Sequence, residues 1–504
     1  MKEMDERYVA AVDLGSSAVR LCVACVRGDE IEVVHYGETE SEGVRSSLIY
    51  NPRMAAAKVG KLVRDAEEAL MVRISQVVVG LPRKDVVQLT ASMKMDRSTP
   101  NEYITKEELQ DLKALALDTY PLPDPQKQGI YGVIAQSFVI EDGMTLRERE
   151  VVGTLSSTIE GRFRVFVGRQ AVAPLDKVFN GLGIAVARQY FLPEASARAV
   201  LSDVERSGGV ALVDVGGGVT SVAIYQGGIL RHFASIPFGG ITVTGDIETE
   251  CSVPLELAER IKVRFGACQP GRLDKLGEKV LQIRLTDPYT EIPVRYISQV
   301  IDARCREIVQ AILYHIEESG YANTLRQGVV VTGGGACLTN FASLFEEMSG
   351  YRVRKGCPRH LFSSAVGNDV FSASASAAVG MVLLAKDDAL PDCAMEAETS
   401  TVKEPETSVA PVTEGLAASS TVEPKPADVQ ATEETPARDD SLLFSPDDFG
   451  EAPTPQPTNT TKQRTKASKP AKPKSKEQTG LIHLVWSTLG DAAIKLYDFI
   501  NEGE

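Results

Sequence analysis

Two aspartates of this sequence stand near the end of an apolar segment, and a run of small residues follows each of them. The run after Asp13 is Gly15, Ser16 and Ser17, and the run after Asp214 is Gly216, Gly217, Gly218 and then Thr220. Backbone without Cβ atoms can approach phosphate oxygens closely, and hydroxyl groups can add hydrogen-bond donors. An aspartate there can hold Mg²⁺, usually through water, because Mg²⁺ dehydrates reluctantly. The residue types predict a phosphate site with Asp13 and Asp214 as its metal ligands.

Strands must bring these turns together. Tyr8–Leu14 and Val19–Val26 flank the first turn, and Val210–Val215 and Thr220–Tyr225 flank the second, so each turn is predicted to close a β-hairpin. A third turn, formed by Gly333, Gly334 and Gly335, follows the strand Val329–Thr332 and precedes a helix over 339–348. One glycine turn is weak evidence, because most are only tight loops. Two matched hairpins about 200 residues apart and a third turn predict a nucleotide site between two α/β halves.

The composition excludes several classes of protein. Of 504 residues 43% are hydrophobic and 24% charged, as in soluble globular proteins, and the net charge of −15 argues against a nucleic-acid partner. No apolar run reaches the ~18 residues of a membrane span, and the charged start does not resemble a secretory signal. The eight cysteines are scattered, and Cys22 and Cys25 are interpreted as buried free thiols of a reducing cytoplasm.

The charge changes abruptly toward the end of the chain. Residues 391–461 hold 15 acidic and 3 basic residues, and residues 462–479 hold 7 basic residues and 1 acidic residue. Residues 391–479 are also rich in proline and nearly free of aromatics, so they cannot bury enough apolar surface to offset the entropy of ordering. We interpret them as a disordered linker. Its one apolar segment, Leu442–Phe449, is a candidate docking motif.

Residues 480–504 are predicted to form an amphipathic helix that lies at a membrane surface. At 100° per residue most apolar side chains fall within an arc of about 160°, and the anchoring set is Leu481, Ile482, Val485, Trp486, Leu489, Leu496 and Ile500. The bilayer interface suits such a stripe and its tryptophan. The basic residues from Lys462 to Lys476 would attract anionic lipid. Docking of this helix on a protein surface is the alternative.

The three glycine turns resemble the motifs of the actin-like ATPase superfamily. VDLGSSAVRL is similar to its first phosphate motif, VALVDVGGGVTSVAIY to its second and GVVVTGGGACLTNF to its adenosine motif, while FSASASAAVGMVL is similar to its last connecting helix. The resemblance implies an α/β fold of two halves, each an RNase H-like domain, with ATP and Mg²⁺ between them. In this superfamily a lysine commonly follows the first turn, whereas this sequence has Ala18, and Arg20 is a candidate substitute.

One segment narrows the resemblance to the bacterial cell-division FtsA family. Ile236–Gly266 has the family's IP-x-G-G, V-T-x-D-I and A-E-x-I-K patterns, and Val86–Val167 lies where FtsA inserts subdomain 1C. That insertion is expected to contain a strand Val86–Met95, a helix Thr105–Thr119 with a Thr105–Glu108 capping box, and strands Tyr131–Ile140 and Val151–Val167. The implied subdomains are 1A (1–85 and 168–194), 1C (86–167), 2A (195–237 and, with a closing 1A helix, 325–390) and 2B (238–324).

The resemblance also implies roles for residues outside the turns. Glu259 and Lys262 would lie near the ribose and base, although a plain salt bridge is the alternative. Arg304, on a helix over 298–318, would receive a carboxylate of the C-terminal peptide of FtsZ, the tubulin-like ring protein. Glu194 is a weak candidate for water activation and is more readily explained as an acid in the first turn of a helix. No catalytic residue is assigned, and at most a weak ATPase is expected.

The function implied is that of a cell-division adaptor. It would bind ATP, polymerise as an actin-like filament on the cytoplasmic face of the inner membrane at the septum, tether FtsZ to lipid, and recruit other divisome proteins. A PilM-like pilus-assembly protein and an actin-fold small-molecule kinase are the alternatives. The kinase would require a catalytic aspartate that acts as base on a substrate hydroxyl. Such kinases lack both the Ile236–Gly266 pattern and the terminal helix, and PilM-like proteins lack a lipid-binding helix of their own.

Overall fold

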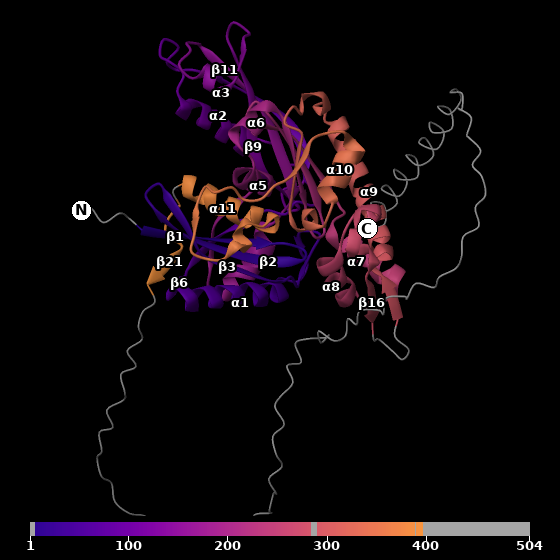
Figure 1. Ribbon diagram of the computed structural model, residues 1–504. Helices are drawn as coiled ribbons and strands as arrows, with labels where there is room; N and C mark the ends of the chain where they lie inside the picture. Colours follow the sequence, from indigo (N-terminus) through magenta and orange to yellow (C-terminus); the bar gives the residue numbers. More distant parts are fainter. Residues whose placement is uncertain (1–5, 284–289, 389, 397–504) are drawn as a thin grey trace, which may run out of the picture. The chain divides into compact units, whose positions relative to one another are not determined.

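The structure is a computed structural model that describes residues 6–283, 290–388 and 390–396, all within one unit of the chain. Three sheets of four or more strands organise this unit (Figure 1). The linker, the segment Leu442–Phe449 and the terminal amphipathic helix lie outside the described residues, so these interpretations stay predictions.

The first sheet carries the N-terminal hairpin. Its strand order is β12-β7-β1-β2-β3-β20, with bounds Ala185–Tyr190, Gln76–Gly80, Glu6–Leu14, Ala18–Arg27, Glu30–Glu40 and Ser363–Ser364. β1 pairs antiparallel with β2 and parallel with β7, so the predicted hairpin is confirmed. Both central strands are buried over most of their length because helices cover both faces of the sheet. Helix α1 (Pro52–Leu70) lies on one face, and α5 (Leu192–Val200) and α11 (Ser376–Asp387) lie on the other (Figure 1).

The second sheet repeats this plan. Its order is β15-β14-β13-β18-β19, with bounds Ile229–Ile236, Thr220–Gln226, Val210–Val215, Val329–Thr332 and Val353–Lys355. β13 pairs antiparallel with β14 and parallel with β18, as β1 does with β2 and β7. The helices that accompany it are α7 (Gly240–Cys251), α8 (Leu255–Phe265), α9 (Val294–Glu318) and α10 (Phe341–Ser349), beside the hairpin of β16 (Val280–Ile283) and β17 (Thr290–Pro293). Two halves of one plan are therefore present, as the sequence predicts.

The third sheet belongs to the inserted segment. Its order is β10-β9-β11-β8, with bounds Thr145–Leu146, Gln128–Ile140, Thr158–Arg169 and Val87–Asp96, and it is accompanied by α2 (Lys106–Asp118) and α3 (Glu148–Val151). The capping box is confirmed: the Glu108 N–H donates to Thr105 Oγ1 at 3.2 Å, and the Thr105 N–H donates to Glu108 Oε2 at 2.9 Å.

The first residue of one predicted strand in this insertion is wrong. The strand expected from Val151 to Val167 begins only at Thr158, because Val151 ends α3 with its side chain fully buried. The following loop bonds instead to the segment before α2, through the Gly153 N–H to the Ile104 carbonyl and the Ile104 N–H to the Thr154 carbonyl, both at 2.9 Å. A buried valine at a helix end contributes the same apolar signal to the sequence as one in a strand.

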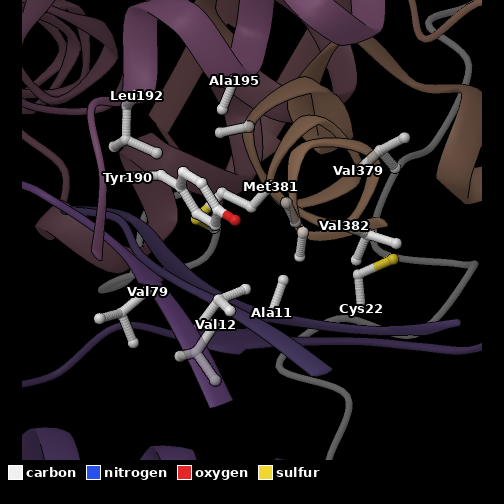
Figure 2. Close-up of a cluster of buried hydrophobic side chains, with 14 of the residues drawn as sticks. Ala11, Val12, Cys22, Val79, Tyr190, Leu192, Ala195, Val379, Met381 and Val382 are labelled. Atoms are coloured by element: carbon white, nitrogen blue, oxygen red, sulfur yellow. The ribbon is translucent and has the colours of Figure 1, made fainter. Parts of the chain in front are cut away.

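The core of the first half lies between its sheet and the pair α5 and α11. Figure 2 shows Met381 and Val382 of α11 facing Ala11 and Cys22, which pair across β1 and β2, and all four are buried. Helix α11 crosses α5 so closely that a Cβ on Gly380 would overlap the Ala195 carbonyl oxygen. This packing fixes α5, which in turn reaches the second sheet through Ser196. Both Cys22 and Cys25 are buried free thiols, as predicted.

The remaining short elements complete the unit. They are β4 (Val44–Arg45), β5 (Leu48–Ile49), β6 (Val72–Ile74), α4 (Val172–Phe179), α6 (Asp203–Gly208) and β21 (Ala394–Glu396). β21 pairs with β6, so the last described residues are held beside the first sheet. None of the described helices has the length and apolar character needed to cross a membrane.

Candidate functional site

The two aspartates occupy equivalent places in their hairpins. Asp13 lies one residue before the end of β1 and pairs with Arg20 across the hairpin, whereas Asp214 lies one residue before the end of β13 and pairs with Ser221. Both side chains are buried. The repeated strand plan therefore supplies two carboxylates and two turns, one from each half of the molecule.

The first and second turns face each other. A Cβ on Gly217 would overlap the Ser17 hydroxyl, and a Cβ on Gly218 would lie 2.9 Å from Ser16 Oγ. Only glycine permits this approach of the two backbones. Among the N–H groups of these turns that donate no hydrogen bond to any described residue are those of Ser16, Ser17, Gly217 and Gly218. Such donors, gathered from two turns, suit an anion with several acceptor oxygens.

The third glycine turn closes the site beside Asp214. Gly333 has a φ of +85°, which favours glycine, and a Cβ there would overlap Asp214 Oδ1. Its N–H donates to the Ala373 carbonyl at 3.1 Å, just before α11. The structure thus brings together Asp13, Asp214 and the three predicted glycine turns, although their contacts with a nucleotide stay a prediction.

Each of the two carboxylates forms an ion pair with an arginine. Arg20 Nη1 is 3.8 Å from Asp13 Oδ2, and its guanidinium also binds Glu38 through Nε at 2.9 Å and Nη2 at 3.0 Å. Arg83 forms an ion pair with Asp214, whose other contact is a hydrogen bond from Ser196 Oγ at 3.2 Å. Burial raises the pKa of the Asp13 carboxyl, while Arg83 and Arg20 lower it and Asp214 raises it.

Sequence reasoning named Arg20 as a substitute for the missing lysine but did not find Arg83. Arg83 lies in the segment between β7 and β8, 131 positions before Asp214, and belongs to none of the recognised motifs. The only signal in the sequence was a basic pair, Arg83 and Lys84, which begins three residues after the end of the buried strand β7. Its meaning depends on tertiary structure, because the ion pair joins the first half of the molecule to the second.

Glu259 and Lys262 lie together on α8 and form an i,i+3 salt bridge in which the Glu259 side chain is 41% exposed. Lys262 is buried, and its Nζ donates to Glu259 Oε2 at 2.7 Å, to Thr244 Oγ1 at 2.8 Å and to the Gly240 carbonyl at 3.0 Å. The Gly240 N–H donates in turn to the Gly216 carbonyl at 2.9 Å. The pair therefore supports the second turn from behind, and its contact with a ribose or base stays a prediction.

Two other residues have positions that bear on their proposed chemistry. The Thr220 hydroxyl donates to the Phe238 carbonyl at 2.8 Å and is fully buried, so it is already engaged within the protein. Glu194 lies in the first turn of α5, two residues before Ser196 and hence on the opposite side of that helix. It lines a cavity of about 400 Å³ with Lys113 and Arg198. Glu194 is solvent-exposed at this cavity, and desolvation by the protein around it raises the pKa of its carboxyl, which Lys113 opposes.

Arg304 lies on α9 and has partners within the protein. Its Nε and Nη2 bind the two carboxylate oxygens of Asp246 on α7 at 2.6 and 2.9 Å, and its Nη1 binds Glu307 at 2.5 Å. Arg304 is therefore already paired within the protein, and its contact with an FtsZ peptide stays a prediction. A peptide carboxylate at this place would have to compete with Asp246.

The donor set fits Mg²⁺ held mainly through water. Within the described ranges no three His, Cys, Asp or Glu side chains gather as a metal cluster. Asp13 and Asp214 would leave the other coordination positions to water and phosphate oxygens, as Mg²⁺ sites with nucleotides usually do. The Arg83 guanidinium already contacts Asp214, so a metal ion at Asp214 would have to share that carboxylate with the arginine.

Two hairpins of one plan, each with an aspartate and a small-residue turn, define an actin-like ATPase fold. A solved PilM–PilN type IV pilus biogenesis complex contains a chain similar to this one, with a TM-score of 0.53 and 16% identity over 75% of this chain and 98% of that chain. At this identity the likeness concerns the fold alone.

Within that fold class the chain is similar to the cell-division protein FtsA. A family model described as "Cell division protein FtsA" matches residues 211–380, which include Asp214, Lys262 and two of the glycine turns. FtsA of Neisseria meningitidis serogroup B is 26% identical over 382 residues, or 72% of this chain and 90% of the relative. FtsA of Borreliella burgdorferi is 28% identical over 387 residues, or 75% and 91%. The resemblance inferred from the sequence is confirmed, and it supports a role in cell division.

Proposed function

We propose that this protein binds ATP with Mg²⁺ between its two halves and acts in division as an adaptor between FtsZ and the membrane. The observation that carries the nucleotide site is the pair of facing turns, whose free N–H groups can bind phosphate oxygens. Bound Mg²⁺ would supply the positive charge that balances the phosphates, with Asp13 and Asp214 as its protein ligands. Hydrolysis should be slow, since Glu194 lies on the side of α5 away from Asp214.

The adaptor role is tested by reconstitution on vesicles. The full chain, Mg·ATP and anionic liposomes should together bring FtsZ filaments into the lipid pellet. FtsZ should stay in the supernatant without the chain. If FtsZ distributes identically with and without this protein, the tethering function is rejected, whatever the nucleotide affinity.

Self-assembly should depend on the inserted segment. Tyr103 and Leu155 flank the hydrogen bonds that join residues 104 and 153–154, and they are 67% and 55% exposed at one end of that segment. We propose that this patch contacts the next subunit head to tail, and such a heterologous contact makes open filaments.

Tyr103→Glu with Leu155→Glu should abolish filaments seen by electron microscopy on lipid and leave Mg·ATP affinity unchanged. Deleting the whole insertion is a poorer test, because Phe166 stacks on Phe191 at 4.9 Å and its removal would open the core. Val204→Glu, which is also exposed but on α6, is the matched control and should polymerise normally. Filaments of normal spacing from the double variant would reject this contact.

The FtsZ peptide should bind at Arg304. Arg304→Ala removes a charged hydrogen-bond donor worth about 1.5–3 kcal/mol, so we expect peptide affinity to fall about 10- to 150-fold. Asp246→Asn weakens the internal competitor for the same guanidinium and should leave affinity equal or higher. Fluorescence anisotropy of a labelled FtsZ C-terminal peptide measures both. An Arg304→Ala variant with unchanged affinity would place the peptide elsewhere.

A further inference from the structure

The backbone of Arg83 is fixed by hydrogen bonds to two serine side chains. Its N–H donates to Ser47 Oγ at 3.1 Å, and its carbonyl accepts from Ser235 Oγ at 2.6 Å. The Ser47 N–H donates in turn to Ser16 Oγ in the first turn, at 2.8 Å. Arg83 is therefore coupled to the first turn through one serine and to the second half of the molecule through another.

The guanidinium of Arg83 is buried and incompletely satisfied. The residue is only 8% exposed, and within the described part of the chain its Nε and Nη1 make no hydrogen bond of good geometry, although Nη1 is in ionic contact with Asp214. Its Nη2 lies 3.7 Å from where a Cβ of Gly216 would be, which places it at the second turn. A buried cationic group with unused donors is costly unless further acceptors are supplied.

Arg20 has fewer unused hydrogen-bond donors than Arg83. Its guanidinium already makes two hydrogen bonds to Glu38 besides its ionic contact with Asp13. Arg83 has the unused donors and lies at the turn whose N–H groups are free. Phosphate oxygens match the fork of a guanidinium and are the acceptors that arginine binds in pairs.

We propose that Arg83 is a phosphate ligand that exchanges its partner: it binds Asp214 in the structure described and moves to a nucleotide phosphate when Asp214 turns to the metal ion. This inference rests on the proposed nucleotide site and adds to it a competition between arginine and metal for one carboxylate. The exchange keeps charges paired on both sides, since Mg²⁺ replaces a guanidinium at Asp214 and phosphate replaces Asp214 at Arg83.

The competition has a consequence that a structural role would not produce. Removing the guanidinium frees Asp214, so a divalent metal offered without nucleotide should bind more tightly. The same change deletes a phosphate ligand, so Mg·ATP should bind more weakly. If Arg83 only held the two halves together, its loss would disorder both aspartates and lower the affinity for both ligands.

The test uses the full chain with Arg83→Gln, Arg83→Lys and, as a matched control, Arg27→Gln. Arg27 pairs with Glu6 and Glu32 at the far end of β2. Calorimetry should measure two ligands separately: Mn²⁺ alone, and Mg·ATP. For Arg83→Gln we expect Mn²⁺ affinity to rise and Mg·ATP affinity to fall, each by about tenfold or more. The control should match the wild type for both ligands.

Arg83→Lys keeps a positive charge at Asp214 but loses the fork, so Mn²⁺ affinity should stay near wild type while Mg·ATP affinity falls severalfold. This variant decides the question if Arg83→Gln fails to fold in a thermal melt. Opposite shifts of the two ligands in Arg83→Gln support the exchange, whereas parallel losses or no change overturn it. A wild-type chain that binds no Mg·ATP overturns the proposed nucleotide site itself.

Discussion

Asp214→Asn should lower the affinity for Mg·ATP about 10- to 150-fold, the equivalent of about 1.5–3 kcal/mol for contacts to a charged group. The change keeps the size of the side chain and its position beside Gly333, but it removes the charge that both the metal and Arg83 require. Calorimetry with Mg·ATP and with ATP in excess EDTA should show the loss only when the metal is present.

Stability must be separated from binding in this experiment. Breaking one side of a buried ion pair can cost about 3–5 kcal/mol, so Asp214→Asn should also unfold at lower temperature. Adding Arg83→Gln removes the unpaired guanidinium and should recover part of that loss without restoring Mg·ATP affinity. Asp203→Asn, at an exposed ion pair with Arg206, is the matched control. Unchanged Mg·ATP affinity in Asp214→Asn would mean that the metal site is misassigned.

The glycine turns and their strands could be predicted because their signals are local. An aspartate near the end of a buried strand, followed by small residues and a second strand, fixes a hairpin almost by itself, and β13 and β18 have the predicted bounds. The repetition of this hairpin about 200 residues later also predicted the two-half plan. The start of the strand at Thr158 was missed because Val151 is buried in a different element.

The electrostatics of the site could not be predicted in the same way. Arg83 meets Asp214 only because two strands of different sheets end at the same place, and no spacing in the sequence records this. Similarly, Lys262 could be placed one turn from Glu259 on a helix, but its bond to Gly240 depends on how α7 and α8 pack. Arg304 was predicted to bind a peptide carboxylate, and its ion pair with Asp246 on the neighbouring helix could not be read from the sequence.

At the end of the chain the signals in the sequence are again local. The residues 481–500 lie outside the described residues, yet their apolar stripe and the basic run before it suggest how membrane binding divides between two forces. Burial of Trp486, Leu489 and Leu496 is worth about 1.5–3 kcal/mol each when complete. The helix itself carries 4 acidic residues and 1 basic residue over 480–504, so attraction to anionic lipid must come from Lys462–Lys476.

Trp486→Glu with Leu489→Glu should therefore release the full chain from liposomes at any salt concentration, because it puts two charges in the centre of the apolar stripe. Neutralising the seven basic residues of 462–476 should weaken binding only partly, and mainly at low salt on anionic vesicles, since exposed charges are screened. Co-sedimentation at two salt concentrations measures both. A double glutamate variant that still pelleted with lipid would make this helix a protein-docking element, and the adaptor would then need another route to the membrane.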